Sequence, residues 1–174
     1  MMDVTCPYCG VGQSVVFYGP GYYSKEQCTE CFEKYWLRHS KLDPVAYKFD
    51  CVEIRSMLVQ HLRHKVTTGY LKISNESDLQ DQLYRVFQNE SWAEFKREIK
   101  LSDQDRIDFL DEESGIGIEV KVRGNANEIL KQLERYAQSD KVKVLILATA
   151  TFMGLPENIN GKPIYMFHLT RGML

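Results

Sequence analysis

Apolar and polar positions in the second half of the chain alternate between helical and strand periodicity. After Asn75-Glu76-Ser77, apolar residues recur at helical spacing, which predicts an amphipathic helix with a capping residue in front. A second amphipathic helix is expected over 125–138. The apolar stripes of the two helices are Leu79, Leu83, Val86 and Phe87 in the first and Ile129, Leu130, Leu133 and Tyr136 in the second.

Strand-like segments surround the second predicted helix. Strands are expected at 95–101, 106–110, 116–122, 142–150 and 163–169. The segment VKVLILATA (142–150) is a near-continuous apolar run, typical of a strand buried on both faces. The predicted order of elements is therefore αβββαβ plus one extra strand.

The first half of the chain carries a cysteine pattern. Cys6-Pro-Tyr-Cys9 and Cys28-Thr-Glu-Cys31 are separated by eighteen residues, the spacing of a structural zinc site. Two disulfides or an iron–sulfur cluster are the alternatives; disulfides fit poorly with an intracellular chain, and paired short loops around a hairpin favour zinc. Four thiolate ligands leave no open position on the ion, so the predicted zinc is structural.

The residues around the cysteines suggest a zinc ribbon. SVVFY and YYSKEQ flank Gly19-Pro20-Gly21, which predicts a hairpin between the two cysteine pairs. Phe32, Tyr35 and Trp36 follow at helical spacing, and they either pack a small domain or stack on bases. Cys51 stands apart and is expected to be a buried apolar side chain.

Between these regions the pattern is ambiguous, since VAYKFDCVEI alternates like a strand whereas a helix is expected over about 52–65. We predict a zinc ribbon at 1–40, a linker and helical connector at 41–74, and the main domain at 75–174. The stretch 54–75 contains no acid, and its basic residues, Arg63 and Lys65 among them, could follow phosphates or form a solvated helix face.

Composition bounds the functional classes. The chain has 174 residues and 44% hydrophobic content, enough for one main domain with a small appendage. No run reaches the ~18 apolar residues of a membrane helix, and MMDVTCPYCG does not resemble a secretory signal. We therefore expect a cytoplasmic protein without a membrane partner. A net charge of −2 does not by itself indicate nucleic-acid binding.

Three residues on two adjacent predicted strands are the candidate site. If EESG (112–115) closes a hairpin, Asp111 pairs with Ile116, and counting inward places Asp108 opposite Glu119. Two neighbouring carboxylates favour a cation between them, and oxygen ligands suit Mg²⁺ or Mn²⁺. The Val120 carbonyl is a candidate third ligand, and Lys121 falls beside the same position.

Strand alternation adds two expectations about the surroundings of these residues. Ile107 and Phe109 should share the core face, with Asp108 on the opposite face, and Gly117 should leave room for a backbone to approach. The alternative interpretation is that Asp108, Glu119 and Lys121 are only the solvated side of a surface hairpin.

The order of elements, with Asp108 and then Glu119-Val120-Lys121 on the second and third strands, resembles the PD-(D/E)xK nuclease superfamily. Gln132 and Tyr136 are spaced like the Q-x3-Y element of its RecB-type branch. Ile107, not proline, precedes the aspartate. The resemblance implies a restriction-endonuclease-like αβββαβ core around a mixed central sheet. The compact form with an N-terminal ribbon is similar to small nucleases of bacteriophages, which act in the host cytoplasm.

The same resemblance implies roles for further residues. Gln132 and Tyr136 would position the DNA strand or the lysine, and Glu76, at the start of the first core helix, would join the site. Glu98 is a candidate outer ligand unless strand alternation faces it away. Arg106, on the face of Asp108, either contacts phosphate or pairs with a carboxylate. The sequence thus predicts a metal-dependent DNA nuclease whose zinc ribbon binds DNA or a partner protein. The alternatives are a non-catalytic adaptor that binds DNA or protein, and a ribbon-bearing transcription factor.

Overall fold

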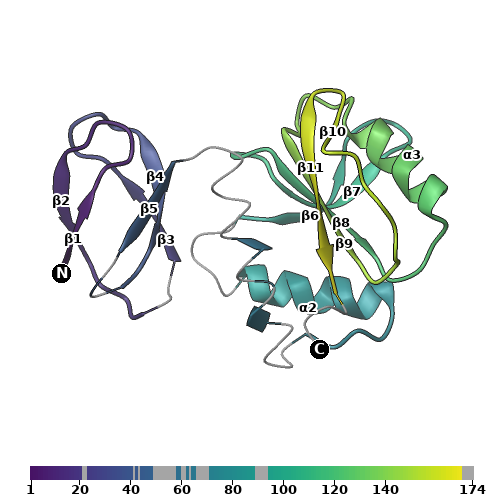
Figure 1. Cartoon of the computed structure of the whole chain (residues 1–174), viewed down its shortest axis with the longest axis horizontal. Helices are drawn as coiled ribbons and strands as arrows, with labels where there is room; N and C mark the ends of the chain where they lie inside the picture. The colour runs from purple at the N-terminus through teal and green to yellow at the C-terminus, as the bar shows by residue number, and fades with distance from the viewer. Residues whose placement is uncertain are drawn as a thin grey trace. The chain divides into compact units, whose positions relative to one another are not determined.

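The structure is a computed structural model that describes residues 1–20, 23–40, 42, 44–48, 58, 59, 62, 64, 65, 71–88 and 94–169. The chain divides into two compact units. The first comprises residues 1–57 and 90–93, and the second comprises 58–89 and 94–174. Figure 1 shows the elements of each unit, and each unit is described by itself.

A six-stranded mixed sheet forms the centre of the second unit, in the order β10-β11-β9-β8-β7-β6. The strands are β6 (Lys96–Lys100), β7 (Arg106–Asp111), β8 (Ile116–Lys121), β9 (Val144–Thr149), β10 (Asn158–Ile159) and β11 (Lys162–His168). Strands β6, β7 and β8 are antiparallel, whereas β8, β9 and β11 are parallel. The predicted α/β order with a mixed sheet is therefore confirmed, and β10 is an addition.

Two helices bury their apolar stripes against this sheet: α2 (Glu76–Gln88) and α3 (Ala126–Tyr136). The Asn75 side chain accepts a hydrogen bond from the backbone N–H of Asp78 (2.9 Å), and Asn125 caps α3 in the same manner. These caps satisfy N–H groups that have no partner within the helix. All four predicted stripe residues of α2 are buried, and in α3 Leu130 is only half-buried.

The two helices cover opposite faces of the sheet, so neither face of its central strands is exposed to solvent. Ile129, Leu133 and Tyr136 of α3 share a core cluster with Leu110, Leu145 and Leu147. Phe109 has the opposite orientation to Leu110 and meets Phe87 of α2, with ring centroids 5.3 Å apart. Every residue from Ile116 to Val120 is buried as a result.

Strict alternation fails in β7 at Asp108, which corrects two expectations. Ile107 packs in the same core cluster as Leu110, although Phe109, two residues further, faces α2. A Cβ atom at Gly117 would lie 2.5 Å from Cδ1 of Ile107, so the space over Gly117 is filled by this side chain and not by a backbone. An irregular strand re-aims side chains, which a period of two does not predict.

The first unit contains two small sheets instead of one hairpin. Its strands are β1 (Met2–Thr5), β2 (Gly12–Val15), β3 (Tyr23–Gln27), β4 (Lys34–Arg38) and β5 (Val45–Lys48). β1 pairs with β2, and β3 pairs with β4, which also pairs with β5. The predicted hairpin around Gly19-Pro20-Gly21 is therefore wrong: each cysteine pair closes its own hairpin, and this segment connects the two sheets.

The helical spacing of Phe32, Tyr35 and Trp36 was also misleading. Tyr35 and Trp36 lie in β4, where alternation buries Tyr35 together with Leu37. Phe32 precedes the strand and is 70% exposed. The packing role expected for these aromatic residues therefore holds for the buried Tyr35 but not for the exposed Phe32.

The predicted connector helix falls largely outside the described residues. Leu58, Val59, Leu62, His64 and Lys65 are helical, which agrees with a helix in this region. Cys51 and Arg63 lie outside the described residues. Across the described parts of the chain, no helix has the length and apolar character needed to cross a membrane.

Candidate functional site

Asp108 and Glu119 are buried acids at the centre of the mixed sheet. The ladder pairs Asp111 with Ile116 and Phe109 with Ile118, as the hairpin count predicts. One step further, Val120 N–H donates to Asp108 Oδ2 (2.7 Å). Asp108 is 9% exposed and Glu119 is 1% exposed, which excludes the surface-hairpin alternative. A structural role alone seldom requires two neighbouring acids at such depth.

Lys121 joins these acids to the first helix. Its Nζ lies 2.9 Å from Oε1 of Glu119 and 3.1 Å from Oε1 of Glu76. Glu76 is the first residue of α2, while Asn75 caps the helix, so the Glu76 side chain is available for Lys121. The structure thus brings together Asp108, Glu119, Lys121 and Glu76 from three separate elements.

The electrostatics of the group follow from its burial. Burial raises the pKa of Asp108 to about 6, opposed by the Val120 N–H. Burial and the neighbouring Asp108 charge raise the pKa of Glu119 to about 8. Burial alone would lower the pKa of Lys121, but Glu119 and Glu76 outweigh it and raise that pKa. Lys121 therefore stays charged, and the two acids resist losing both protons.

Asp108, Glu119 and Glu76 are the acids that could hold a divalent cation, although the group of three or more ligand side chains that the described residues bring together is the four cysteines. Oε2 of Glu119 is buried and has no hydrogen-bond partner among the described residues. When all are ionised, Asp108, Glu119 and Glu76 carry three negative charges against one positive charge on Lys121, which leaves −2. Oxygen donors with this net charge suit Mg²⁺ or Mn²⁺. Val120 is seen to contribute its N–H to Asp108, so the metal-ligand role of its carbonyl stays a prediction.

Gln132 and Tyr136 lie together on α3 and hold the beginning of β7. The Gln132 amide donates to the Tyr136 hydroxyl, which donates to the carbonyl of Arg106. The Tyr136 ring is buried in the core cluster. Burial raises the pKa of Tyr136, and the nearby Glu119 and Asp108 charges raise it further. The Tyr136 hydroxyl is therefore near Asp108 and Glu119 and remains protonated.

Two charged residues lie at the rim of the group. Arg106 and Glu98 are exposed and form an ion pair of 3.7 Å, so Arg106 pairs with a carboxylate in this structure. Glu98 has a φ of 53° and its charge contributes to the raised pKa of Asp108. The phosphate contact predicted for Arg106 stays a prediction, as does that of Lys65.

Sequence reasoning missed Thr149, which fixes the backbone of Lys121. Thr149 is fully buried, and its hydroxyl donates to the Lys121 carbonyl (2.7 Å). The Ala150 N–H donates to the same carbonyl (3.1 Å), and the Thr151 N–H donates to Thr149 Oγ1 (2.9 Å). A hydroxyl at the end of an otherwise apolar strand was the available signal.

A cavity of about 260 Å³ opens beside the Glu76 end of the group. Its lining residues are Ser74, Asn75, Glu76, Val122 and Arg123. Glu76 therefore both lines this cavity and contacts Lys121 of the buried group.

The four cysteines of the first unit form a second candidate centre. The Sγ atoms of Cys6, Cys9, Cys28 and Cys31 all lie within 4.8 Å of one another. Cys6 and Cys31 are 3.7 Å apart, and Cys9 and Cys28 are 3.6 Å apart. A tetrahedral zinc with bonds of about 2.3 Å would separate its sulfurs by about 3.8 Å, whereas a disulfide needs about 2.05 Å. The cluster could therefore form a zinc site.

The two cysteine loops have the same backbone geometry. Gly10 N–H donates to the Cys6 carbonyl (3.0 Å), and Phe32 N–H donates to the Cys28 carbonyl (3.1 Å). Gly10 and Phe32 both have a positive φ, 77° and 58°. Phe32 thus takes a left-handed conformation that favours glycine.

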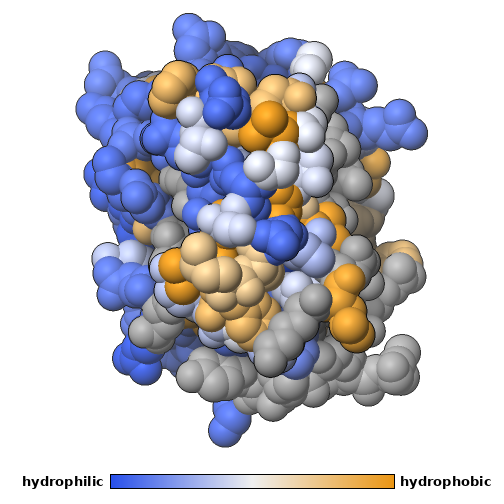
Figure 2. Space-filling model, turned by 90° about the vertical axis from the view of Figure 1, so that its left-hand side faces the viewer, coloured by the Kyte–Doolittle hydropathy of each residue, from blue (hydrophilic) through white to orange (hydrophobic). Residues whose placement is uncertain are grey.

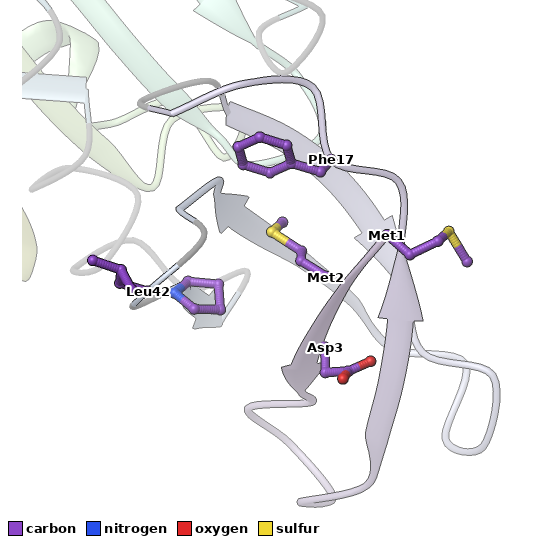
Figure 3. A pocket seen from close by; sticks show the side chains of 6 residues that line it. Met1, Met2, Asp3, Phe17 and Leu42 are labelled. Carbon is purple, nitrogen blue, oxygen red and sulfur yellow. The ribbon is translucent and has the colours of Figure 1, made fainter.

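Apolar side chains are exposed on the first unit. Met1, Val16, Tyr18 and Leu42 are all more than half exposed. Figure 2 shows apolar residues gathered among hydrophilic ones on one face of the molecule. In Figure 3, Phe17 and Met2 extend toward Leu42 across a hollow of about 730 Å³.

Comparisons with known proteins add no family to this picture. No protein-family model, no curated protein and no solved structure matches the chain.

Proposed function

We propose that the chain is a metal-dependent nuclease that hydrolyses phosphodiester bonds in DNA, with a core of the PD-(D/E)xK type. The observation that carries the proposal is the buried acid pair with one oxygen, Glu119 Oε2, that lacks a partner among the described residues, beside a fixed lysine. The resemblance of Asp108, Glu119-Val120-Lys121 and Gln132/Tyr136 to the superfamily motifs supports it.

Asp108 and Glu119 would hold the Mg²⁺ or Mn²⁺. Such an ion supplies polarisation of the scissile phosphate and a lowered pKa for water. Lys121 would orient the attacking water or offset the charge that develops on the phosphorane, because its ammonium lies beside Glu119. Glu76 would hold the other side of that ammonium, and Tyr136 with Gln132 would keep β7 in place.

The four-cysteine unit would bind a structural zinc and contact DNA or a partner protein. All four ligands are thiolates, so the zinc would have no open position for substrate.

The test is cleavage of circular and linear DNA with Mg²⁺. Asp108→Asn and Lys121→Ala should each lower the rate by at least about a hundredfold, since each removes a group that would act on the transition state. Lys131→Ala, at an exposed position of α3, is the matched control and should cleave like the wild type. Equal cleavage by all four proteins would refute the proposal.

A second candidate is a non-catalytic adaptor, which the exposed apolar residues around the hollow of the first unit favour. Titration with Mn²⁺ separates the two candidates. A nuclease should bind the ion and lose that binding in Asp108→Asn, whereas an adaptor should show no binding that depends on Asp108.

A further inference from the structure

Three parallel strands place Lys121, Thr149 and His168 in one row at the carboxyl edge of the sheet. Lys121 is the register partner of Thr149, which is the partner of His168. Register partners share a face of the sheet, and neighbouring strands lie about 4.8 Å apart. His168 therefore lies roughly 10 Å from Lys121 along this edge. The carboxyl edge of parallel strands is where α/β sheets bind ligands.

Phe152 stands at this edge and is 84% exposed. Its ring meets the His168 ring edge-on, with centroids 6.4 Å apart. The segment that carries Phe152 is anchored on both sides: Thr151 N–H is bound to Thr149 Oγ1, and Met153 packs against the core cluster. Leu155 packs there as well. The fold therefore displays one aromatic ring to solvent from a fixed backbone.

An exposed aromatic ring beside a candidate nuclease site has the chemistry to bind a nucleobase. Stacking on an aromatic side chain is tolerant of base identity, because every base has a π-face. The Phe152 ring contacts His168, which lies roughly 10 Å from Lys121 along the same edge, so a short single-stranded segment could span both positions. Bases inside a duplex are covered by their neighbours on both faces, so the ring would take an unpaired base.

We propose that Phe152, braced by His168, is a stacking platform for one unpaired base of a DNA strand that runs to the Lys121 site. This inference rests on the proposed nuclease function and narrows its substrate to DNA with a single-stranded segment.

The experiment uses Phe152→Trp in the full chain, with Asp108→Asn added so that the strand stays intact. The fluorescence of the introduced indole reports stacking directly, after subtraction of the signal from the Asp108→Asn protein, which contains Trp36 and Trp92. Oligo(dT) should quench this fluorescence, and a duplex of equal length should not. Glu134→Trp, at an exposed position of α3, is the matched control and should not be quenched.

Affinity provides a second readout. Phe152→Ala should weaken binding of single-stranded DNA by roughly five- to a hundredfold and leave duplex binding unchanged, whereas Phe152→Tyr should keep most of the affinity. The stacking proposal would be overturned if duplex DNA quenches the fluorescence as strongly as oligo(dT), or if only RNA quenches it. It would also be overturned if the affinity of Phe152→Ala for single-stranded DNA is within about twofold of that of the wild type.

The outcome for the platform is separable from that for the nuclease. Quenching by oligo(dT) without cleavage by the wild type would support the platform and refute the nuclease. Cleavage without quenching would refute the platform alone.

Discussion

At the scale of single residues, the two acids at the centre of the sheet are costly to ionise because they are buried. Asp108 and Glu119 each have a raised pKa because the fold removes them from water. Lys121 offsets one of their charges, so a second cation is needed before both acids can be ionised at no cost.

This predicts a pH dependence for the metal-free protein. In the folded chain the pKa of Asp108 is about 6 and that of Glu119 is about 8, whereas both are near 4 when unfolded. The folded chain keeps protons that the unfolded chain releases, so this contribution to stability is fully present below about pH 4 and is lost progressively as the pH rises to about 8. The melting temperature of the α/β unit should therefore fall across this window.

Two comparisons check that assignment by calorimetry. The side chain at position 119 of the Glu119→Gln variant cannot ionise, so the melting temperature of this variant should fall less between about pH 6 and about pH 8 than that of the wild type. Saturating Mn²⁺ should raise the melting temperature more at about pH 8 than at about pH 6, because the ion binds the ionised form of the acids. A melting temperature of the metal-free wild type that does not change between these pH values would contradict the burial argument.

Thr149 gives a second prediction at this scale. Thr149→Val keeps the shape of the side chain but removes the donor to the Lys121 carbonyl and the acceptor of the Thr151 N–H. We expect a loss of about 1–3 kcal/mol in the free energy of unfolding and a lower kcat for cleavage with little change in KM. Thr149→Ser keeps the hydroxyl and should restore kcat. If Val and Ser variants have equal kcat, Thr149 does not position Lys121.

The residues of the site show how far sequence reasoning reached. Asp108, Glu119 and Lys121 could be grouped because hairpin counting needs only the turn and the period of a strand. Glu76 could be suggested only by resemblance, because its contact with Lys121 joins elements 45 residues apart. Ile107 and Phe109 were expected on one face, but Ile107 packs in the cluster of α3 whereas Phe109 meets α2, and strict alternation cannot predict such an irregularity in β7.

At the scale of elements, strong local signals gave reliable predictions and short strands did not. The helices have an asparagine cap and an apolar stripe, and the second helix, expected over 125–138, was located to within two residues at each end. The strands of the first unit have four or five residues, too few to show a period clearly. Each cysteine loop joins the two strands that pair with each other. The sequence shows these loops only as C-x2-C spacing, from which the strand pairing could not be predicted.

Those loops yield a prediction about Phe32. Phe32 takes the positive φ that Gly10 takes in the other loop, and it is largely exposed. Phe32→Gly removes a left-handed strain of about 1–2 kcal/mol and adds about 0.5–1 kcal/mol of chain entropy to the unfolded state. We therefore expect a net gain of up to about 1 kcal/mol, seen as tighter zinc in a competition with a chelator.

Gly10→Ala is the matched change in the opposite direction and should weaken zinc binding, since alanine at a φ of 77° is strained. Weaker zinc binding in Phe32→Gly than in the wild type would show that the Phe32 ring stabilises the loop, contrary to its exposure.

At the scale of the whole molecule, the chain combines two units with different sources of stability. The α/β unit buries continuous apolar strands and the stripes of two helices. The first unit buries a small apolar cluster that includes Cys6 and Cys28 themselves. A core of that size does not usually support a fold without a metal or cross-links.

If the four cysteines hold zinc, its removal should therefore unfold the first unit and leave the α/β unit folded. Cys6→Ser removes one thiolate from the cluster, and we expect loss of dispersed amide resonances for 1–40 with those of 94–169 retained in a two-dimensional NMR spectrum. Cys51→Ser is the control, since Cys51 lies outside the two C-x2-C pairs of the sequence. Asp108-dependent cleavage of a short oligonucleotide should persist in Cys6→Ser if the ribbon only recruits DNA or a partner. Loss of resonances from both units together would show that they fold as one cooperative body, and the ribbon would then be part of the catalytic fold.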